Sequence, residues 1–390
     1  PEAILVMERL IERAGREMDI APAEIRRRNL VLPEAMPYTN ALGVTYDSGE
    51  FEQTMDAAER LADVEGFPAR RRDSESRGLL RGIGYAMMLE SGGVGLPERA
   101  DVECTPTGRL IVRIGTMSNG QSHETVYAQM LADTLGVDIE AIEIRQGDSA
   151  ETPWGMGTGA SRSITVGGSA LIVAGKQLID AGRAIAADLL EAASADLSYA
   201  CGAYSVTGTD RRATLTAVAA HAATRGLALD ASYRYVPEQG TYPNGCHIAE
   251  VEIDPETGVT TVARYSAAQD VGRALNPMVI EGQIAGGIVQ GIGEALTEAM
   301  RYDTDSAQVL TGSFLDYAMP RADLIPSIAI AILEVPCTHT PTGAKSVGET
   351  GTTAAPAAIA NAMLDALAPM GVGEIELPAT PEGVRRAFHP

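Results

Sequence analysis

The chain has 390 residues, of which 30 are Lys or Arg and 52 are Asp or Glu, so its formal net charge at pH 7 is −22. Apolar residues make up 45% of the sequence, which excludes an acidic disordered tail and allows a large buried core in one or more domains. The negative charge disfavours nucleic acids and anionic membranes as main partners. A small anionic ligand stays open, because backbone amides can form a local positive site.

The cysteines lie far apart in the sequence, at Cys104, Cys201, Cys246 and Cys337. This spacing supports neither a CxxC zinc site nor a local iron–sulfur motif nor a disulfide scaffold. No apolar run has the ~20 residues of a membrane span, and no signal peptide opens the sequence. We therefore expect a reducing compartment and a cytoplasmic location.

The N-terminal fifth of the sequence is predicted to be mainly helical, because its apolar residues recur at helical spacing between charged ones. In chain order we expect a helix over residues 3–18, a second over 22–29, an extended segment over 30–49 and a helix over 50–64. The stretch 65–78 is polar and rich in Arg, and we expect a domain boundary there. The predicted domains are residues 1–77 and 78–390.

Strands and helices alternate in the remaining sequence. In chain order the expected elements are a strand over 82–90, a hairpin over 100–114, a helix over 122–135, a strand over 142–146, a helix over 165–195, a hairpin over 247–265 and helices over 281–299 and 353–367. Both hairpins have Gly-containing turns, at 106–108 and 254–258. Because no regular βαβ period is present, the predicted fold class is α+β.

Two familiar metal and nucleotide motifs fail on spacing. His123-Glu124 begins like the helix of a zinc protease, but Tyr127 stands where the second His ligand is required. The glycines of 155–159, 287–293 and 343–346 do not match the spacing of a dinucleotide-binding or phosphate-binding loop. For 287–293, tight helix packing explains the glycines better.

Four loops combine Gly with short hydroxyl, amide or charged side chains: 118–123, 157–163, 269–272 and 342–351. Such loops expose many backbone N–H donors, and together they are suited to hold a large phosphate-bearing ligand. Ordinary turns in a Gly-rich protein are the structural alternative.

A family resemblance gives these loops a more specific interpretation. The segments GQSHETVYAQ, GTGASRS, HIAEVEIDPETG, DVGRALNP, GQIAGGIVQGIGEAL, FLDYAMPRAD, GAKSVGETGTTAAPAAIANAM and LPATPEGV occur in this order along the whole chain. In them the sequence resembles the molybdenum-binding large subunit of the xanthine dehydrogenase/aldehyde oxidase family, and most of all its carbon monoxide dehydrogenase-like group. The resemblance implies that residues 1–77 are the end of the first molybdenum-cofactor domain and that residues 78–390 are the second.

The large subunit of that family is about twice as long, so the resemblance implies one part of a split or cleaved subunit within a hetero-oligomer. It also implies molybdenum bound to molybdopterin cytosine dinucleotide, the metal being held by the pterin dithiolene and not by side chains. Such an enzyme oxidises an aldehyde or an N-heteroaromatic compound with water-derived oxygen. Expected partners are the complementary N-terminal half, an iron–sulfur small subunit and an FAD medium subunit, none of whose clusters this chain would bind.

The catalytic glutamate of the family falls on Glu349. A carboxylate is suited to act as the general base for the oxygen nucleophile, and burial beside the cofactor would tune its pKa. The alternative is that Glu349 only caps the following helix. Glu349→Gln is expected to keep the shape of the site and remove the base.

The resemblance implies a cofactor cradle made of the four loops. Its residues are Gln121, Ser122, His123, Thr158, Gly159, Ser161, Arg162, Ser163, Gln269, Asp270, Val271, Gly272, Lys345, Ser346, Val347 and Gly348. Ser122 stands where the family usually has Gly. The guanidinium fork of Arg162 between two hydroxyls is chemically apt for a pyrophosphate.

Three other functions stay open. A truncated member of the family could persist as a scaffold without turnover. A carbon monoxide-oxidising member is also compatible with the sequence, because the cysteine loop that distinguishes it would lie outside this chain. The third alternative is a general nucleotide-binding protein.

Overall fold

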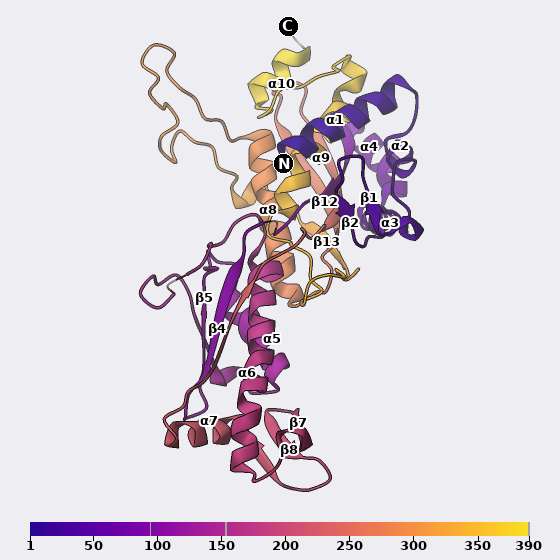
Figure 1. Cartoon of the computed structure of the whole chain (residues 1–390). Coiled ribbons are helices and arrows are strands. Elements are labelled where there is room, and N and C mark those ends of the chain that lie inside the picture. Colours follow the sequence, from indigo (N-terminus) through magenta and orange to yellow (C-terminus); the bar gives the residue numbers. More distant parts are fainter. Residues whose placement is uncertain (94, 153, 389–390) are drawn as a thin grey trace. The chain divides into compact units, whose positions relative to one another are not determined.

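The computed structural model describes residues 1–93, 95–152 and 154–388, which form two compact units (Figure 1). Unit 1 contains Pro1–Glu90, Tyr242–Pro336 and the C-terminal segment from Val347. Unit 2 contains Ser91–Thr241 and Cys337–Ser346. The division at residue 77 follows the pattern of the family and stays a prediction.

Unit 1 is built on a four-stranded sheet with the order β13-β12-β11-β3. These strands are β3 (Leu80–Leu89), β11 (Asn244–Ile253), β12 (Thr260–Asp270) and β13 (Ile328–Leu333). The hairpin predicted over 247–265 is confirmed, since β11 and β12 pair antiparallel with Ala249 opposite Tyr265. β13 joins β12 in parallel.

Helices cover both faces of this sheet. The helices of unit 1 are α1 (Glu2–Glu17), α2 (Pro22–Arg27), α3 (Phe51–Ala62), α4 (Phe67–Ser76), α8 (Pro277–Leu296), α9 (Thr350–Leu367) and α10 (Pro381–Phe388). Side chains of α8 and α9 share a core with Val251 and Ala267, whereas Met55 and Ala58 of α3 pack with Ile248 and Ala268 from the other face. A small hairpin of β1 (Tyr38–Thr39) and β2 (Thr45–Tyr46) lies in the segment predicted to be extended.

The polar stretch predicted as a boundary is the helix α4. Its charges are used within unit 1, because Arg70 pairs with Glu250 at 2.6 Å and Arg77 with Glu252. Glu250 and Glu252 lie on β11. The charged side chains therefore attach α4 to the sheet.

The helix predicted at the N-terminus exists, and its buried face combines the predicted apolar residues Ile4 and Leu5, which pack against the main core, with two acids. Glu8 and Glu12 are buried and bind Arg26 at 2.7 and 3.2 Å, whereas Leu10 and Met18 are exposed. Burial raises the pKa of both carboxyl groups. The ion pairs with Arg26 compensate for removing these acids from water.

Glycines allow α8 and α9 to cross closely. A Cβ atom on Gly287 would lie 2.9 Å from the backbone nitrogen of Thr352, and one on Gly351 would lie 2.3 Å from the carbonyl oxygen of Ile284. The helix-packing interpretation of the glycines in 287–293 is thereby confirmed. Gly84 likewise lets α9 pack closely on β3, because a Cβ atom at this position would lie 2.1 Å from the backbone nitrogen of Ala362.

Unit 2 has its own four-stranded sheet, with the order β10-β4-β5-β6. These strands are β4 (Glu98–Cys104), β5 (Leu110–Ile114), β6 (Ile142–Arg145) and β10 (Leu229–Tyr235). β4 and β5 form the predicted hairpin, with Val102 opposite Val112. The unit also contains α5 (His123–Leu135), a π-helical turn (Ser163–Gly168), α6 (Ser169–Leu189), α7 (Leu215–Thr224) and a sheet of β7 (Leu197–Ala200), β8 (Ala203–Val206) and β9 (Arg212–Thr214).

The α+β class is confirmed, and several details differ. The helix predicted over 165–195 begins as a π-helical turn and ends at Leu189. The strands β7 to β10, the strand β13 and the helix α7 were not predicted. Short 3₁₀ helices occupy Pro33–Ala35, Val64–Gly66, Ile139–Ala141, Ser194–Asp196, Ala322–Leu324 and Ala368–Met370. No helix in the described parts of the chain is long and apolar enough to cross a lipid bilayer.

Candidate functional site

Two of the predicted cradle loops are joined by hydrogen bonds in unit 2. Thr158 Oγ1 donates to the carbonyl of Met117 at 2.6 Å, and it lies 3.3 Å from Ser163 Oγ. The loop before α5 and the loop before α6 therefore lie side by side. Both precede helices, so their backbone N–H groups include helix N-terminal donors.

Tyr127 joins these two loops by hydrogen bonds. From the sequence alone, it is notable only because it stands where a zinc protease has its second His. Its hydroxyl donates to the carbonyl of Ser163 at 2.9 Å and lies 2.7 Å from Thr116 Oγ1. The side chain is fully buried, and burial raises its pKa. Gly167 leaves room for it, since a Cβ atom there would lie 3.0 Å from the Tyr127 hydroxyl oxygen.

The loop around Lys345 and Ser346 joins the same group through Gly92 and Gly93. A Cβ atom on Gly92 would lie 1.9 Å from Ser346 Oγ, and the amide of Gly93 donates to the carbonyl of Ala160 at 3.0 Å. Lys345 and Ser346 are buried. Three segments predicted for the cradle thus come together within unit 2.

Arg162 is turned inward from this group of loops. Its guanidinium donates to Glu98 Oε2 at 2.8 Å and to the carbonyls of Gly157, Leu96 and Pro97. Both charged side chains are almost fully buried. In this arrangement Arg162 fixes the path of the 157–163 loop, and its fork is already occupied by protein oxygens.

Glu98 is the partner that sequence reasoning missed. Its oxygens also accept from the amides of Arg99 at 3.0 Å and Met156 at 3.3 Å. Gly115 makes room for it, because a Cβ atom there would lie 2.4 Å from Glu98 Oε1. A signal was present in the sequence, since Glu98 shares the inward register of β4 with Ala100 and Val102.

One side of these loops borders open space. A Cβ atom on Gly120, Gly157 or Gly159 would meet no other atom within 4 Å. The backbone around them takes left-handed conformations, including Ser122 with φ of 57° and Ser161 with φ of 51°. Open backbone of this kind matches what a phosphate-rich ligand requires.

Gln121 belongs to the loop before α5 and His123 to the first turn of that helix. His123 is 2% exposed, and its Nδ1 atom has no hydrogen-bond partner among the described residues. Burial lowers the pKa of its imidazole. Gln121 is half-buried, and its side-chain oxygen accepts from the amide of Asn119. The imidazole of His123 is packed inside the loop, against the ring of Tyr127 at 5.1 Å between centroids.

The predicted residues 269–272 lie in unit 1, at the end of β12. Asp270 is fully buried, and its Oδ1 accepts from the amides of Gly272 at 3.0 Å and Val335 at 3.1 Å. Its Oδ2 accepts from Asn244 Nδ2 at 2.9 Å. The amide of Val271 donates to the carbonyl of Leu333 at 3.1 Å. The Asp270 side chain thus holds the loop that follows β12 against the end of β13.

Gln269 belongs to a second buried network. Its amide lies against Nε2 of His247, whose Nδ1 lies 2.8 Å from the hydroxyl of Tyr265. Burial lowers the pKa of His247 to about 3, so the imidazole is neutral in the folded chain. His247 and Asn244 were not predicted as site residues.

Glu349 directly precedes α9 in unit 1, with its side chain exposed. Its carbonyl accepts from Thr353 N at 3.1 Å and from Thr353 Oγ1 at 2.7 Å, whereas its carboxylate makes no capping hydrogen bond. The alternative that Glu349 only caps the helix therefore holds for its backbone carbonyl and not for its carboxylate. The sequence predicts that this carboxylate is buried, but Glu349 is exposed in unit 1. Gly348 is also exposed, and Val347 packs against the main core.

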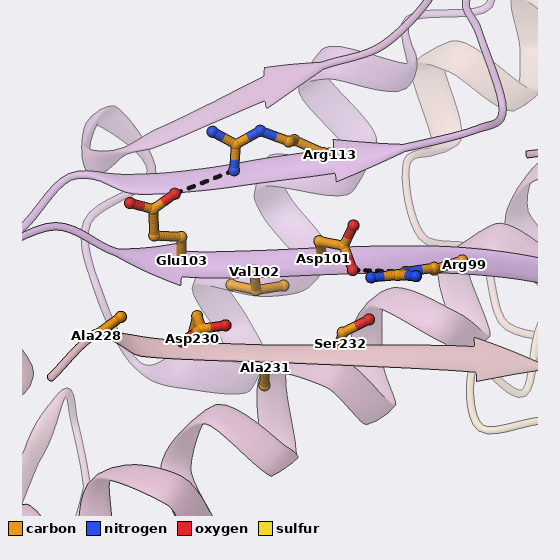
Figure 2. A pocket seen from close by; sticks show the side chains of 9 residues that line it. All are labelled: Arg99, Asp101, Val102, Glu103, Arg113, Ala228, Asp230, Ala231 and Ser232. Atoms are coloured by element: carbon orange, nitrogen blue, oxygen red, sulfur yellow. Dashed lines mark hydrogen bonds and ion pairs between the residues drawn. The ribbon is translucent and has the colours of Figure 1, made fainter. Parts of the chain in front are cut away.

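A hollow of about 380 Å³ on the outer side of β10 and β4 contains none of the predicted residues (Figure 2). Four of its five charged side chains form two ion pairs, Arg99 with Asp101 at 2.8 Å and Arg113 with Glu103 at 3.1 Å, and the fifth is Asp230. Paired surface charges leave little unsatisfied charge for a ligand. The converging loops are the better candidate site.

Comparison with known proteins identifies the family of this chain. Residues 57–326 match the model of the molybdopterin cofactor-binding domain. The chain belongs to the molybdopterin cofactor-binding domain family. Two of the converging loops, 118–123 and 157–163, lie within the matched residues.

Relatives of the family extend over nearly the whole chain. The large subunit of nicotine 6-hydroxylase from Paenarthrobacter nicotinovorans is 35% identical over 98% of this chain and 49% of its own length. The carbon monoxide dehydrogenase large chain of Hydrogenophaga pseudoflava is 34% identical over 97% of this chain and 50% of its own length. The chain is thus homologous to part of these large subunits and spans about half the length of the relatives it matches.

Solved structures agree with the sequence relatives. Quinoline 2-oxidoreductase from Pseudomonas putida 86 superposes with a TM-score of 0.92 at 36% identity, covering 99% of this chain and 52% of its own. The Cu,Mo-CO dehydrogenase gives a TM-score of 0.91 at 32% identity. The predicted fold of a molybdenum hydroxylase large subunit is confirmed.

Proposed function

We propose that this chain forms the cofactor-binding and catalytic part of a molybdenum hydroxylase large subunit. The observation that carries the proposal is the convergence in unit 2 of three predicted loops beside open backbone. Family membership identifies the ligand class as a molybdopterin. Sequence resemblance favours the cytosine dinucleotide form.

The residues of this chain would hold that cofactor mainly through backbone donors. The open amides around Gly120 and Gly159, with the hydroxyls of Ser161 and Ser163, suit phosphate and pterin oxygens. Arg162 and Asp270 would act as positioning residues, because both use their side chains to fix loops. Lys345, Ser346, Val347 and Gly348 would lead the chain to Glu349. When bound, the cofactor supplies two-electron oxidation of a substrate carbon.

Glu349 is proposed as the general base. Glu349 is exposed in this chain, its side chain does not cap α9, and the family resemblance places the catalytic glutamate at this position. An aldehyde or N-heteroaromatic substrate would take up oxygen derived from water. Electrons would leave through the iron–sulfur and FAD subunits. Nicotine 6-hydroxylase and quinoline 2-oxidoreductase, both named after N-heterocycles, make this substrate class the first to test.

Because the chain spans half the length of its relatives, we propose that activity requires a complementary polypeptide. Residues 1–77 would then belong to the first cofactor domain, which that polypeptide completes. We expect the complex in the cytoplasm, in keeping with four dispersed cysteines, among which the described structure contains no disulfide.

The proposal is tested on the complex purified from its own cells through a tag on this chain. We expect about one molybdenum per chain by elemental analysis. Acid treatment should release cytidine monophosphate, and N-heterocycles or aldehydes should be oxidised. A stable complex without molybdenum or nucleotide would support the scaffold alternative. Release of another nucleotide would support a general nucleotide-binding protein, and turnover of carbon monoxide alone would identify that branch of the family.

Glu349→Gln is predicted to lower kcat by at least ~100-fold, because general-base catalysis contributes about 10²–10⁴-fold. Molybdenum content and the absorption spectrum should stay unchanged, since the amide keeps the shape of the carboxylate. Glu376→Gln is the matched control, as Glu376 is also an exposed glutamate of unit 1. Equal activity of both variants would exclude Glu349 as the base.

A further inference from the structure

A long excursion of the chain connects α8 to β13 in unit 1. This segment, residues 297–327, is called the arm. Figure 1 shows it as the orange loop that leaves the end of α8 and projects away from the helices of the unit. Its regular structure is a 3₁₀ helix at Ala322–Leu324 and a bridge between Tyr302 and Val309.

The arm exposes large apolar side chains at the apex of its turn 313–316. Phe314 is 87% exposed and Leu315 is 93% exposed. Other arm residues exposed to about half or more are Met300, Tyr302, Leu310 and Met319. Scattered single apolar residues on a surface need no explanation, but adjacent ones gathered on one projecting segment indicate an interaction site.

Hydrogen bonds within the turn 313–316 order its backbone. Asp316 N and Tyr317 N both donate to the carbonyl of Ser313, at 3.1 and 2.9 Å. Ser313 Oγ donates to Asp316 Oδ2 at 2.7 Å and accepts from Leu315 N at 3.3 Å. These bonds hold Phe314 and Leu315 at the apex before any partner arrives.

The base of the arm is attached to unit 1. Tyr317 donates to Glu298 Oε2 at 2.8 Å, and the amide of Leu310 donates to the carbonyl of Arg301 at 2.8 Å. Pro320 lies close to α8, since a Cβ atom on Gly293 would be 2.9 Å from its Cδ. A preformed apex on an anchored base loses little conformational entropy on binding, which is the property of a hot-spot anchor.

We propose that Phe314 and Leu315 insert into an apolar pocket of the complementary polypeptide, the one corresponding to the part of the relatives' large subunits that this chain does not match. The inference rests on the two-chain assembly of the proposed function. About half of the length of each relative lies outside the match, although the match covers 97% or more of this chain. A polypeptide of that size is large enough to supply the pocket.

Charge disfavours a second copy of this chain as the occupant. The arm contains Asp303, Asp305, Asp316 and Asp323 and two arginines, and the whole chain carries −22. Two copies would bring like charges together around the apolar apex, which costs association energy. The face of α1 with Val6, Met7 and Leu10 is a second exposed apolar surface of unit 1 that the same polypeptide would cover.

Photo-crosslinking in the native complex identifies the occupant. A benzophenone amino acid replaces Phe314 in the tagged full chain, and the adducts are sequenced by mass spectrometry. The control carries the same group at Leu42, which is 88% exposed but stands alone on a turn of unit 1. We expect adducts at 314 with a polypeptide that aligns to the unmatched part of the large subunits. Adducts with a second copy, with an unrelated protein, or no more adducts than at Leu42 would overturn the proposal.

The affinity of the purified partner chains then measures the contribution of the apex. Phe314→Asp is expected to weaken their association at least tenfold, whereas Leu42→Asp should leave it within twofold. Unchanged thermal unfolding of the isolated chain shows that the loss is not a folding defect. Equal affinity of both variants would refute the anchor. Molybdenum analysis separates this result from the proposed function, because an anchored complex without molybdenum refutes the function alone.

Discussion

Glu98 and Arg162 form a buried ion pair at the candidate site. Each carboxylate oxygen of Glu98 accepts from a backbone amide, and the guanidinium is surrounded by carbonyl oxygens. Such a pair is costly to form but fixes its surroundings, since removing one partner leaves an uncompensated charge. The pair thereby ties the start of β4 to the loop before α6.

Glu98→Gln is therefore predicted to destabilise the chain by about 3–5 kcal/mol, the usual cost of breaking a buried pair. The matched control is Glu103→Gln, because Glu103 lies on the same strand in a partly exposed pair with Arg113 and should cost about 1 kcal/mol or less. Urea unfolding of both variants gives the comparison. Similar costs for the two substitutions would mean that Arg162 finds other partners.

His247 gives unit 1 a pH dependence at the residue scale. Its folded pKa is lowered to about 3, against about 6.5 in the unfolded chain. Between these values the unfolded state binds the proton and the folded state does not, so stability falls as the pH falls through this window. The slope from this group approaches about 1.4 kcal/mol per pH unit.

His247→Gln should flatten this dependence. We expect the difference in unfolding free energy between wild type and variant to shrink as the pH falls from 7 to 5, since only the wild type loses stability through this group. Urea titrations at both pH values measure it. A difference that stays constant with pH would show that the pKa of His247 is the same in the folded and unfolded chain.

At the scale of elements, the crossing of α8 and α9 depends on particular glycines. Gly287 and Gly286 are neighbours on α8, but only Gly287 faces α9. At Gly287 a Cβ atom would press on the backbone of α9, whereas at Gly286 it would meet nothing within 4 Å. Sequence neighbours thus have opposite packing roles on the same helix.

Gly287→Ala is predicted to lower the unfolding free energy by about 1–3 kcal/mol, the range of overpacked cores. Gly286→Ala should raise it by up to about 1 kcal/mol, because alanine favours the helix and no atom obstructs the methyl group. Thermal unfolding of both variants decides the matter. Equal stability of Gly287→Ala and Gly286→Ala would contradict the prediction, because it would mean that α8 and α9 can move apart to accept the methyl group.

At the scale of the whole molecule, the two units have separate sheets and separate helical layers. Stability changes in one unit are therefore expected to stay within it, as substitutions far apart without shared partners are nearly additive. The candidate site residues divide between the units, with the three converging loops in unit 2 and Glu349 in unit 1.

Hydrogen exchange by mass spectrometry tests this independence. Gly287→Ala should increase exchange in α8, α9 and β3 and leave the β4–β5 hairpin unchanged. Glu98→Gln should do the reverse. Increased exchange in both units with either variant would show that they unfold as one cooperative body.

The sequence by itself determined the α+β class, both hairpins, most long helices and the family, because these depend on local periodicity, turn residues and ordered motifs. It also predicted a cradle of four loops, of which parts of three come together in unit 2 whereas 269–272 lies in unit 1. It did not predict that Arg162 faces Glu98, that Glu8 and Glu12 are buried on α1, or that His247 and Tyr127 belong to buried hydrogen-bond networks. Those outcomes depend on partners far away in the chain, such as Arg26 for Glu8 and Ser163 for Tyr127. Only tertiary packing decides which polar groups find such partners, since a buried charge is stable only where its counterpart is brought beside it.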